Sequence, residues 1–586
     1  MRPDKYRIYL VSVIIILLLA LISSLYVLLS EYDSLIAGIT ATIHKNGLEE
    51  KIRTSLFTRQ RFVWAKRLAS LVIILLPLGC WLALRFRSFI TARFRVLFIS
   101  VWQSVKSSVA VFQNNSRRQN KAVAALMTII ILFYSYHMIS GYLRYDEMWS
   151  FNYYTDHPFY YSFFTFSNYP LFEATTHFFK WLPTPMKINL RLSPFFAGIS
   201  SCFLLYACLR KYYNSHFVAM AGVIALAFAP LTAIFMVNAR GVMHELFFAI
   251  AGIFSFLFWM ERPDRKRYLV VYFVAAVAGV YSMITHFLLL FLLLVAGLWV
   301  LKNKKRPAIA LFLKINLLII VVCLLCYAPM MFTTGIAVFE DIISTTPSYY
   351  HILIALPDTM QSVFMAYTGR SYISVVLFLV AIAILPLLKN KLASRWHLMI
   401  FLIVGLPVSG VFLYLVTRFL FTGRSLAFGS LAIPLLVSLF AAAAAALPAW
   451  NKKWQNSIGC IAVVVLLLAD GYFYLPAIAV DKQSAAISRL LIENGVTTCY
   501  DNSSMNSGFF YYYPGIEYYY RISHKSIELT LSAKNSMRYK PLLARDRYDC
   551  IVYNSSTPES VRPQNFHEIY QDSFGKFEIW KRNDLQ

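Results

Sequence analysis

The chain has 586 residues, of which 59% are hydrophobic and only 14% are charged, and its formal net charge is +27. These charged residues are too few to cover the surface of a soluble protein of this size, which excludes a soluble globular fold. Lys and Arg occur in short clusters between apolar runs rather than in one polar domain. That distribution is the positive-inside pattern of membrane proteins, and it argues against nucleic acid as a partner.

The apolar runs predict the membrane-spanning helices. At about twenty residues per span, the sequence contains roughly thirteen candidates. The first run lacks an obvious small-residue cleavage site, so we expect a retained signal anchor. The predicted spans are Tyr9–Leu29, Leu68–Leu84, Val123–Gly141, Pro194–Leu209, Phe217–Val237, His244–Met260, Leu269–Thr285, Phe287–Leu301, Ile315–Ala328, Val375–Leu388, Leu398–Val416, Leu426–Leu447 and Ile458–Leu475.

The basic clusters between the spans predict the side of the membrane on which each loop lies. The segment Arg85–Lys121 is rich in Lys and Arg and should stay in the cytoplasm. The next span then crosses outward and places Asp146 and Glu147 on the external face. Later basic loops fall on the cytoplasmic side in the same alternation. The basic segment Lys45–Arg67 is the exception, because the alternation places it outside.

Apolar density falls after Val480, which predicts a domain boundary. We expect an N-terminal extension with two spans and a basic cytoplasmic segment (1–121), a transmembrane core (122–477) with its first external loop at 142–192, and an extracytoplasmic α/β domain (478–586). The elements predicted in this last domain are a helix over Ser484–Asn494, stopped by Gly495, and strands over Val496–Tyr500, Tyr548–Tyr553 and Phe577–Trp580.

Two of the eight cysteines differ from the others. Six lie in apolar runs, where Cys behaves as a small buried hydrophobic residue. Cys499 and Cys550 lie in the polar C-terminal region. A disulfide between these two is allowed if that region is outside the cytoplasm.

Three stretches in the first part of the predicted core form a pattern. The first is the Asp146-Glu147 pair in the first large external loop. The second is the run YPLFEATTHFFKWLPTPMKINLRLSPFFAGISSCFLLYACLRKYY, whose marker residues are Pro170, Leu171, His177, Arg191, Leu192, Ser193, Pro194 and Gly198. The third is the loop AFAPLTAIFMVNARGVM, in which Ala239 and Arg240 precede the next span.

This pattern resembles the polyprenyl- and dolichyl-phosphate-sugar glycosyltransferases of the GT-C class, specifically the bacterial branch similar to protein O-mannosyltransferases and to the aminoarabinose transferase of lipid A. The resemblance is strong over Tyr142–Phe258 and implies an α-helical polytopic membrane protein with a GT-C-like core. Tyr169 departs from it, because relatives often have His or Pro before Pro170. The Val237-Asn238 pair stands where relatives often have Gln-Glu. The two N-terminal spans are additional to the family's usual start.

The resemblance implies a glycosyltransferase of the bacterial inner membrane. It would move a hexosyl or pentosyl group from a polyprenyl-phosphate donor to an extracytoplasmic lipid, glycan or protein acceptor, by a single inverting displacement. One alternative is a polytopic transporter or flippase, although transporters usually place ionisable residues near the membrane midplane. Another alternative is a polymerase or ligase for lipid-linked saccharides.

Asp146 and Glu147 are the candidates for catalysis. Transfer of a sugar to a hydroxyl group needs a carboxylate that takes the acceptor proton or holds a metal ion that does so. Adjacent residues point in different directions on a helix or strand. We therefore expect Asp146 to be the base and Glu147 to orient the substrate or to bind a divalent metal ion, the candidate cofactor. The alternative is that both are solvated loop acids beside Arg144.

Arginines at the predicted outer span ends are candidates for binding the donor phosphate. The planar guanidinium holds phosphate oxygens bidentately, and the leaving phosphate gains negative charge as the glycosidic bond breaks. The alternative for each arginine is snorkelling toward lipid headgroups. The candidates are Arg191, Arg240, Arg370, Arg418 and Arg424, and His244 maps to the same span ends.

Glu173 and His177 lie four residues apart and would share one face of a helix. This spacing permits a contact to the acceptor or to a metal ion. Tyr169 is a candidate for the same role because it departs from the resemblance at the position before Pro170, where relatives often have His or Pro. The alternative for His177 is a hydrogen-bonded structural role.

Overall fold

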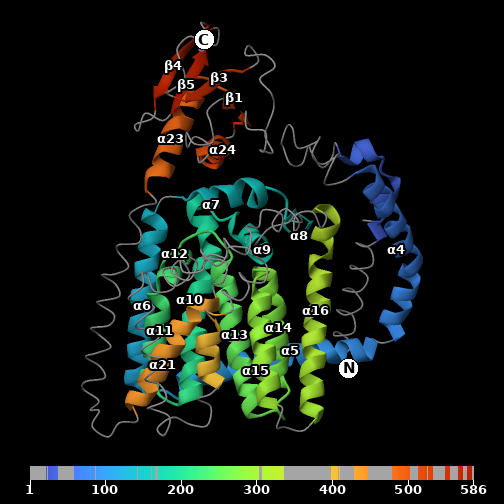
Figure 1. The fold of residues 1–586 in the computed structure, drawn as a ribbon, viewed down its shortest axis with the longest axis vertical. Helices are drawn as coiled ribbons and strands as arrows, with labels where there is room; N and C mark the ends of the chain where they lie inside the picture. The colour runs from blue at the N-terminus through green and yellow to red at the C-terminus, as the bar shows by residue number, and fades with distance from the viewer. Residues whose placement is uncertain are drawn as a thin grey trace, which may run out of the picture. The chain divides into compact units, whose positions relative to one another are not determined.

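The computed structural model forms two compact units (Figure 1). The helical unit comprises Ser100–Ala479, and the sheet-bearing unit comprises Met1–Ile99 with Val480–Gln586. The residues that the structure describes are 21–22, 24–36, 58–85, 87–141, 143–159, 161–164, 169–301, 306–334, 398–406, 408, 428–445, 478–501, 512–523, 525–531, 548–554, 565–571 and 577–583.

The described part of the helical unit consists of helices joined by short loops. Short helices α7, α8 and α9 lie between the long helices α6 and α10, and a π-helix at Phe151–Thr155 continues α7. The helices are α5 (Arg87–Gln113, which begins in the other unit), α6 (Arg117–Ser140), α7 (Tyr145–Ser150), α8 (Tyr161–Phe164), α9 (Pro170–Phe179), α10 (Met186–Tyr213), α11 (His216–Ala227), α12 (Pro230–Phe235), α13 (Val242–Glu261), α14 (Arg267–Ser282), α15 (His286–Leu301), α16 (Arg306–Thr334) and α21 (Ala432–Ala445).

The protein is a multi-pass membrane protein. Across the described ranges, five helices are long and apolar enough to cross a membrane, and shorter apolar helices accompany them. The five are Arg95–Gln113, Arg117–Ser140, Met186–Tyr213, Val242–Glu261 and Pro307–Met331. The bundle core lies where α13 packs between α10 and α14, around fully buried aromatic side chains such as Trp259, Tyr206 and Tyr272.

Helices α6 and α10 run in opposite directions, which defines two ends of the bundle. Where α6 begins and α10 ends, Asn115 donates a hydrogen bond to the Tyr206 hydroxyl at 2.9 Å, and Arg210 donates to Asn115 at 3.3 Å. Where α6 ends and α10 begins, Arg191 donates to the Met138 carbonyl at 3.1 Å. The first junction is called the basic end below, and the second is called the site end.

Basic residues gather at the basic end. Lys211 Nζ donates to the Tyr268 hydroxyl at 3.1 Å, and Arg267 donates to the same hydroxyl at 3.2 Å. The first turn of α14 therefore meets the last turn of α10. Asp146 follows the opposite end of α6. This separation of basic loops from the acidic pair is the arrangement that the charge alternation predicts.

Several predicted spans correspond to helices, and others do not. The predicted span Phe217–Val237 divides into α11 and α12, because Ala229 precedes Pro230 and adopts an extended backbone. The predicted basic loop Arg85–Lys121 is mostly helical, since it includes all of α5. The predicted spans Val375–Leu388 and Ile458–Leu475 lie outside the described residues. The number thirteen and the three-part domain division remain predictions.

The sheet-bearing unit contains a five-stranded mixed sheet in the order β2-β1-β3-β5-β4. Strand β1 pairs in parallel with β2 and β3, whereas β5 pairs antiparallel with β3 and β4. Gly495 has a φ of +66° just beyond α23, the left-handed conformation of a helix C-cap. The elements are α4 (Arg59–Arg85), α23 (Ile478–Glu493), β1 (Thr498–Asp501), α24 (Tyr513–Ile522), β2 (Glu528–Leu531), β3 (Cys550–Asn554), β4 (Phe566–Gln571) and β5 (Phe577–Arg582).

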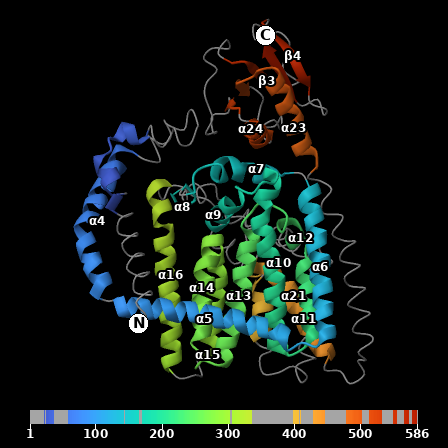
Figure 2. The same cartoon turned by 180° about the vertical axis from the view of Figure 1, so that it is seen from behind.

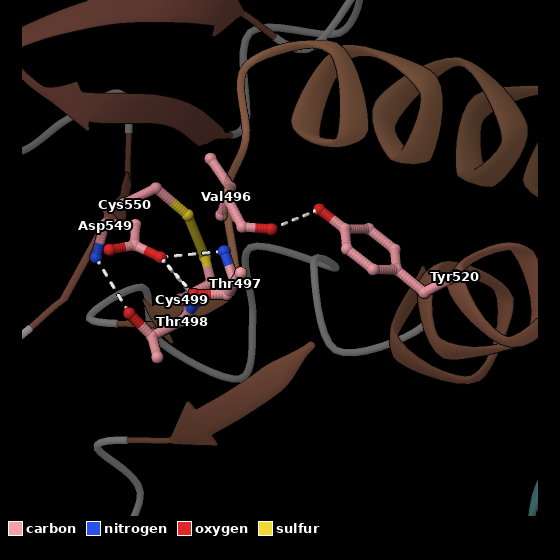
Figure 3. Close-up of a disulfide and its surroundings, with 7 residues drawn as sticks. All are labelled: Val496, Thr497, Thr498, Cys499, Tyr520, Asp549 and Cys550. Atoms are coloured by element: carbon pink, nitrogen blue, oxygen red, sulfur yellow. Dashed lines mark hydrogen bonds between the residues drawn. A yellow bond between two sulfur atoms is a disulfide. The ribbon is translucent and has the colours of Figure 1, made fainter. Parts of the chain in front are cut away.

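Cys499 and Cys550 form a disulfide across the β1–β3 pair, where the two residues are register partners (Figure 3). Asp549, the residue before Cys550, accepts hydrogen bonds from the backbone N–H groups of Thr497 and Thr498 at 2.7 and 2.9 Å. Burial raises the pKa of the Asp549 carboxyl, but these hydrogen bonds outweigh it and hold the pKa below its usual value. The disulfide allowed by the sequence is thus present in the sheet.

Candidate active site

Glu147 is the centre of the polar contacts at the site end. It lies in the first turn of α7 and has no solvent exposure. Arg191, from the second turn of α10, donates from Nε to Glu147 Oε1 and from Nη2 to Oε2, each at 2.7 Å. The pair is therefore bidentate, the strongest geometry for a guanidinium and a carboxylate.

The other donors of Arg191 bind the end of α6. Nη1 donates to the carbonyls of Met138 at 3.1 Å and Gly141 at 2.9 Å. A Cβ on Gly141 would lie 2.6 Å from the His137 carbonyl oxygen and 3.3 Å from Arg191 Nη1. The close approach of α6 and Arg191 therefore requires glycine at position 141. One buried arginine joins the end of α6 to α7 and α10.

Glu147 also accepts two backbone hydrogen bonds. The N–H of Arg144 donates to Oε2 at 2.8 Å, which caps α7, and the N–H of Ala239 donates to Oε1 at 2.9 Å. Burial alone would raise the pKa of Glu147, but the Arg191 guanidinium and these hydrogen bonds outweigh burial and lower it. Glu147 is therefore an anion that fixes the loop between α12 and α13 against α7.

Asp146 and Arg240 form an ion pair beside this buried connection. Asp146 precedes Glu147 in the chain, and Arg240 follows Ala239. The buried hydrogen bond between Ala239 and Glu147 therefore sets the position of the partly exposed Asp146–Arg240 pair. The Asp146 side chain is 33% exposed and the Arg240 side chain 16% exposed. Within the described residues, these side chains bring an accessible carboxylate and an accessible guanidinium together.

Tyr169 lies against the same loop. The Arg240 guanidinium carbon is 5.9 Å from the centre of the Tyr169 ring, a cation–π arrangement. A Cβ on Gly241 would lie 2.8 Å from Tyr169 Cβ and Cδ1. Glycine at position 241 therefore lets the aromatic ring pack directly on the backbone that carries Arg240.

Glu173 lies in a second buried polar group on α9. It is fully buried, and it accepts a hydrogen bond from Thr155 Oγ1 at 3.3 Å and another from Ser150. Burial raises the pKa of Glu173 well above its usual value, despite these hydrogen bonds. Among the described residues, no cation contributes to this shift as Arg191 does for Glu147, so burial favours the protonated form of Glu173.

His177 lies one turn after Glu173 and is also buried. Burial and the nearby Lys180 lower the pKa of His177 to about 4, although its hydrogen bond to the Tyr154 carbonyl opposes the shift. Lys180 itself donates to the carbonyls of Thr155 and Asp156, each at 3.1 Å. This group ties α9 to the π-helix.

The sequence places His244 at an outer span end but does not predict its partners. Its Nε2 lies 2.9 Å from Ser193 Oγ and 3.3 Å from Thr175 Oγ1, which joins α13, α10 and α9. One turn of α13 also carries the fully buried Glu245, whose Oε1 lies 3.5 Å from His286 Nδ1. Both pairs join residues far apart in the sequence, so no local pattern could have revealed them.

The structure brings together five of the predicted site residues and separates two. Arg370, Arg418 and Arg424 lie outside the described residues. Among the residues that are described, no group of three or more His, Cys, Asp or Glu side chains could hold a metal ion. Asp146, Glu147, Arg191, Arg240 and Tyr169 form one connected cluster, whereas Glu173 and His177 belong to the group on α9.

Solved structures with a similar fold provide an independent comparison. ArnT from Cupriavidus metallidurans in the apo state matches with a TM-score of 0.52 and 11% identity, over 80% of this chain and 99% of that chain. The same protein bound to undecaprenyl phosphate matches with a TM-score of 0.49 and 11% identity, over 78% and 98%. The archaeal oligosaccharyltransferase AglB from Archaeoglobus fulgidus, in complex with an inhibitory peptide and a dolichol-phosphate, matches with a TM-score of 0.45 and 10% identity, over 75% and 70%.

No protein-family model matches the sequence, and no curated protein matches it significantly. At 11% identity, the likeness to apo ArnT establishes the fold and leaves the activity to the chemistry of the site. The resemblance found in the sequence is confirmed at this level: the chain has the GT-C fold of ArnT.

Proposed function

We propose that the protein is a membrane glycosyltransferase that moves a sugar from a polyprenyl-phosphate donor to a hydroxyl group of a lipid, glycan or protein acceptor. The observation that carries the proposal is the accessible Asp146–Arg240 pair, held in place by the buried Glu147–Arg191 pair. ArnT, whose fold the chain shares, binds undecaprenyl phosphate, which supports the class of donor.

The proposed reaction is one displacement at the anomeric carbon. The acceptor oxygen attacks that carbon, and its proton passes to the Asp146 carboxylate. The bond from the carbon to the phosphate oxygen breaks, and the polyprenyl phosphate leaves with the electron pair. Arg240 binds the phosphate and stabilises its growing charge. Asp146 therefore supplies general-base catalysis.

Arg240 is paired with Asp146 in the structure. A guanidinium has five N–H donors in a planar fork, so it can turn toward a phosphate while remaining near the carboxylate. A bound donor phosphate would compete for these donors and leave more of the Asp146 carboxylate available to the acceptor proton. The pair would thus couple donor binding to exposure of the base.

We assign Glu147 and Arg191 to positioning rather than to contact with substrate. Both oxygens of Glu147 already accept hydrogen bonds, and the donors of Arg191 bind Glu147 and the end of α6. Neither side chain is exposed by more than 3%. A divalent metal ion remains a prediction, and no step here passes through one.

The transporter alternative would be favoured by ionisable residues at mid-bundle. Glu245 and His286 are buried inside the bundle, but they lie in the first turns of α13 and α15, which places the pair beside the loop that carries Arg240. This position fits support of the site better than a path through the membrane.

The test uses purified protein in lipid vesicles with undecaprenyl phosphate that carries a labelled hexose or pentose. The proposal predicts labelled acceptor and released undecaprenyl phosphate in equal amounts. Replacement Arg240→Gln should lower kcat/KM by about 10- to 100-fold, as expected for loss of a charge-assisted contact of about 1.5–3 kcal/mol. The matched control is Arg262→Gln, an exposed arginine between α13 and α14.

Three outcomes would contradict the proposal. Movement of intact donor across the vesicle membrane without cleavage would indicate a flippase. Equal loss of activity in Arg240→Gln and Arg262→Gln would remove Arg240 from the phosphate site. Transfer of an entire oligosaccharide from a lipid diphosphate, with no use of single-sugar donors, would identify the ligase alternative.

A further inference from the structure

Helix α5 has a different relationship to the bundle from the other long helices. Figure 2, the view from behind, shows α5 running across α10, α13 and α14 rather than along them, and in Figure 1 α5 lies behind these helices. Within the helical unit, residues 100–113 of α5 contact the C-terminal part of α10, toward the basic end. Phe112 stacks on Tyr206 with ring centres 5.2 Å apart, and Lys211 donates to Ser107 Oγ at 3.1 Å.

The side of α5 that faces the bundle is rich in serine. Ser100 is buried, and Ser107 contacts Lys211. Ser104 and Ser108 satisfy their hydroxyls on the α5 backbone, at 2.9 Å to the Ser100 carbonyl and 3.1 Å to the Ser104 carbonyl. The small side chains allow α5 to lie close to the ends of its neighbours. Apolar packing of α5 on the core comes from its last turn, where Val111 and Phe112 lie.

The opposite side of α5 carries an exposed apolar stripe. Phe98, Trp102, Val105 and Val109 follow the spacing i, i+4, i+7 and i+11, which places them on one helix face. Their exposed fractions are 69%, 51%, 48% and 51%. A helix on a water-facing surface turns its apolar face toward the protein. Helix α5 does the reverse, because its serines face the protein and its large apolar side chains face away.

Cationic groups border this stripe. Lys106 Nζ lies 5.7 Å from the centre of the Trp102 ring, and Arg95 is exposed on the same helix. Arg210 and Lys211 lie at the end of α10 that α5 crosses. Trp beside Lys or Arg is typical of the boundary between lipid headgroups and acyl chains. Positive charge at that depth complements anionic headgroups.

We infer that α5 lies in the plane of the membrane surface at the basic end of the bundle, with its apolar stripe among acyl chains and Arg95 and Lys106 among anionic phospholipid headgroups. Residues 95–113 are also long and apolar enough to cross a membrane. The crossing seen in Figure 2 and the contacts with the C-terminal part of α10 favour the in-plane orientation over a span.

The experiment measures membrane depth with nitroxide labels on the full chain in lipid nanodiscs. Single variants Phe98→Cys, Val105→Cys and Val109→Cys carry the label on the stripe, and Gln103→Cys is the matched exposed polar control. A high collision rate of the nitroxide with oxygen indicates that the label lies among acyl chains. A high collision rate with a water-soluble nickel complex indicates that the label lies in water. The unsubstituted chain measures labelling of the native cysteines.

The in-plane orientation predicts a several-fold higher oxygen-to-nickel ratio at the three stripe positions than at Gln103. It also predicts equal depth for Phe98 and Val109, although about 16 Å of helix separates them at 1.5 Å per residue. A depth that changes steadily from Phe98 to Val109 would identify a membrane span and overturn the inference. Labels protected from both reagents would identify a protein partner, and nickel access equal to Gln103 would identify water.

The lipid charge is tested in the same samples. Replacing phosphatidylglycerol by phosphatidylcholine should lower the oxygen-to-nickel ratio at Val105, and Lys106→Gln should reduce that dependence on lipid charge. A ratio that is the same in both lipids would overturn the assignment to an anionic surface.

Discussion

Glu147 and Arg191 form a bidentate ion pair that excludes solvent from both side chains, with two N–O distances of 2.7 Å. The pair joins α7 to α10, and the remaining contacts of the two residues extend to the end of α6 and to Ala239. The positions of Asp146 and Arg240 follow from this buried connection, because each is adjacent in sequence to a residue that it holds.

Replacing one member of the Glu147–Arg191 pair should destabilise the protein more than replacing both. Arg191→Met leaves the Glu147 carboxylate buried without its cation, and we expect a loss of about 3–5 kcal/mol of stability. The double variant with Glu147→Gln should recover part of that loss, because no buried charge is then left. Thermal unfolding in detergent measures both, and a double variant less stable than Arg191→Met would contradict this account.

The sequence identified the residue types of this cluster but could not assign their partners. Charge alternation between apolar runs placed Asp146 and Arg240 at the same end of the bundle, as observed. It could not show that Arg191, 44 residues after Glu147, is buried against that carboxylate, because periodicity defines faces of helices and leaves their tertiary partners open. Arg191 was therefore predicted to bind phosphate.

For the helices too, the sequence predicts some features and leaves others open. Runs of twenty apolar residues are a strong signal, and α6, α10 and α13 appear where such runs are. The break between α11 and α12 has a local signal in the sequence, because Pro230 stands at the first position of α12. Helix α5 was missed because its basic residues were counted as a loop, although its apolar residues recur with the spacing of one helix face.

Glu173 should make stability depend on pH on the alkaline side. Its pKa is raised in the folded state, so its contribution is fully present below the unfolded pKa of about 4.3 and is lost as pH rises through the higher folded pKa. Glu173→Gln keeps the shape without the charge. The melting temperature of the variant should therefore exceed that of the unsubstituted protein increasingly as pH rises, and parallel curves would contradict the raised pKa.

His177 should make stability depend on pH on the acidic side. Its folded pKa of about 4 lies below the unfolded value of 6.5, so its contribution is present above pH 6.5 and is lost as pH falls toward 4. His177→Gln cannot be protonated in this range. Melting curves recorded from pH 7 to pH 4 should fall less steeply for the variant than for the unsubstituted protein. Equal slopes would show that His177 titrates normally.

The Cys499–Cys550 disulfide should stabilise the sheet, because it closes a loop with a sequence separation of 51. Replacing both cysteines by alanine should cost about 2–4 kcal/mol and should increase cleavage of the C-terminal region by added protease. Cys323→Ala with Cys326→Ala in α16 is the control, since both are free cysteines. Peptide mapping without reductant checks the bond directly, and two unlinked peptides would contradict the structure.

The most direct test of the proposed reaction is the single-turnover rate of Asp146→Asn beside Asp264→Asn, an exposed acid at the other end of α13. Loss of the Asp146–Arg240 pair should change the melting temperature little, because the aspartate is one-third exposed. With a saturating undecaprenyl-phosphate sugar, we expect the rate of Asp146→Asn to fall by about 10²- to 10⁴-fold, the usual contribution of a general base. Asp264→Asn should keep the full rate. A folded Asp146→Asn protein that transfers sugar as fast as Asp264→Asn would contradict the central role of Asp146.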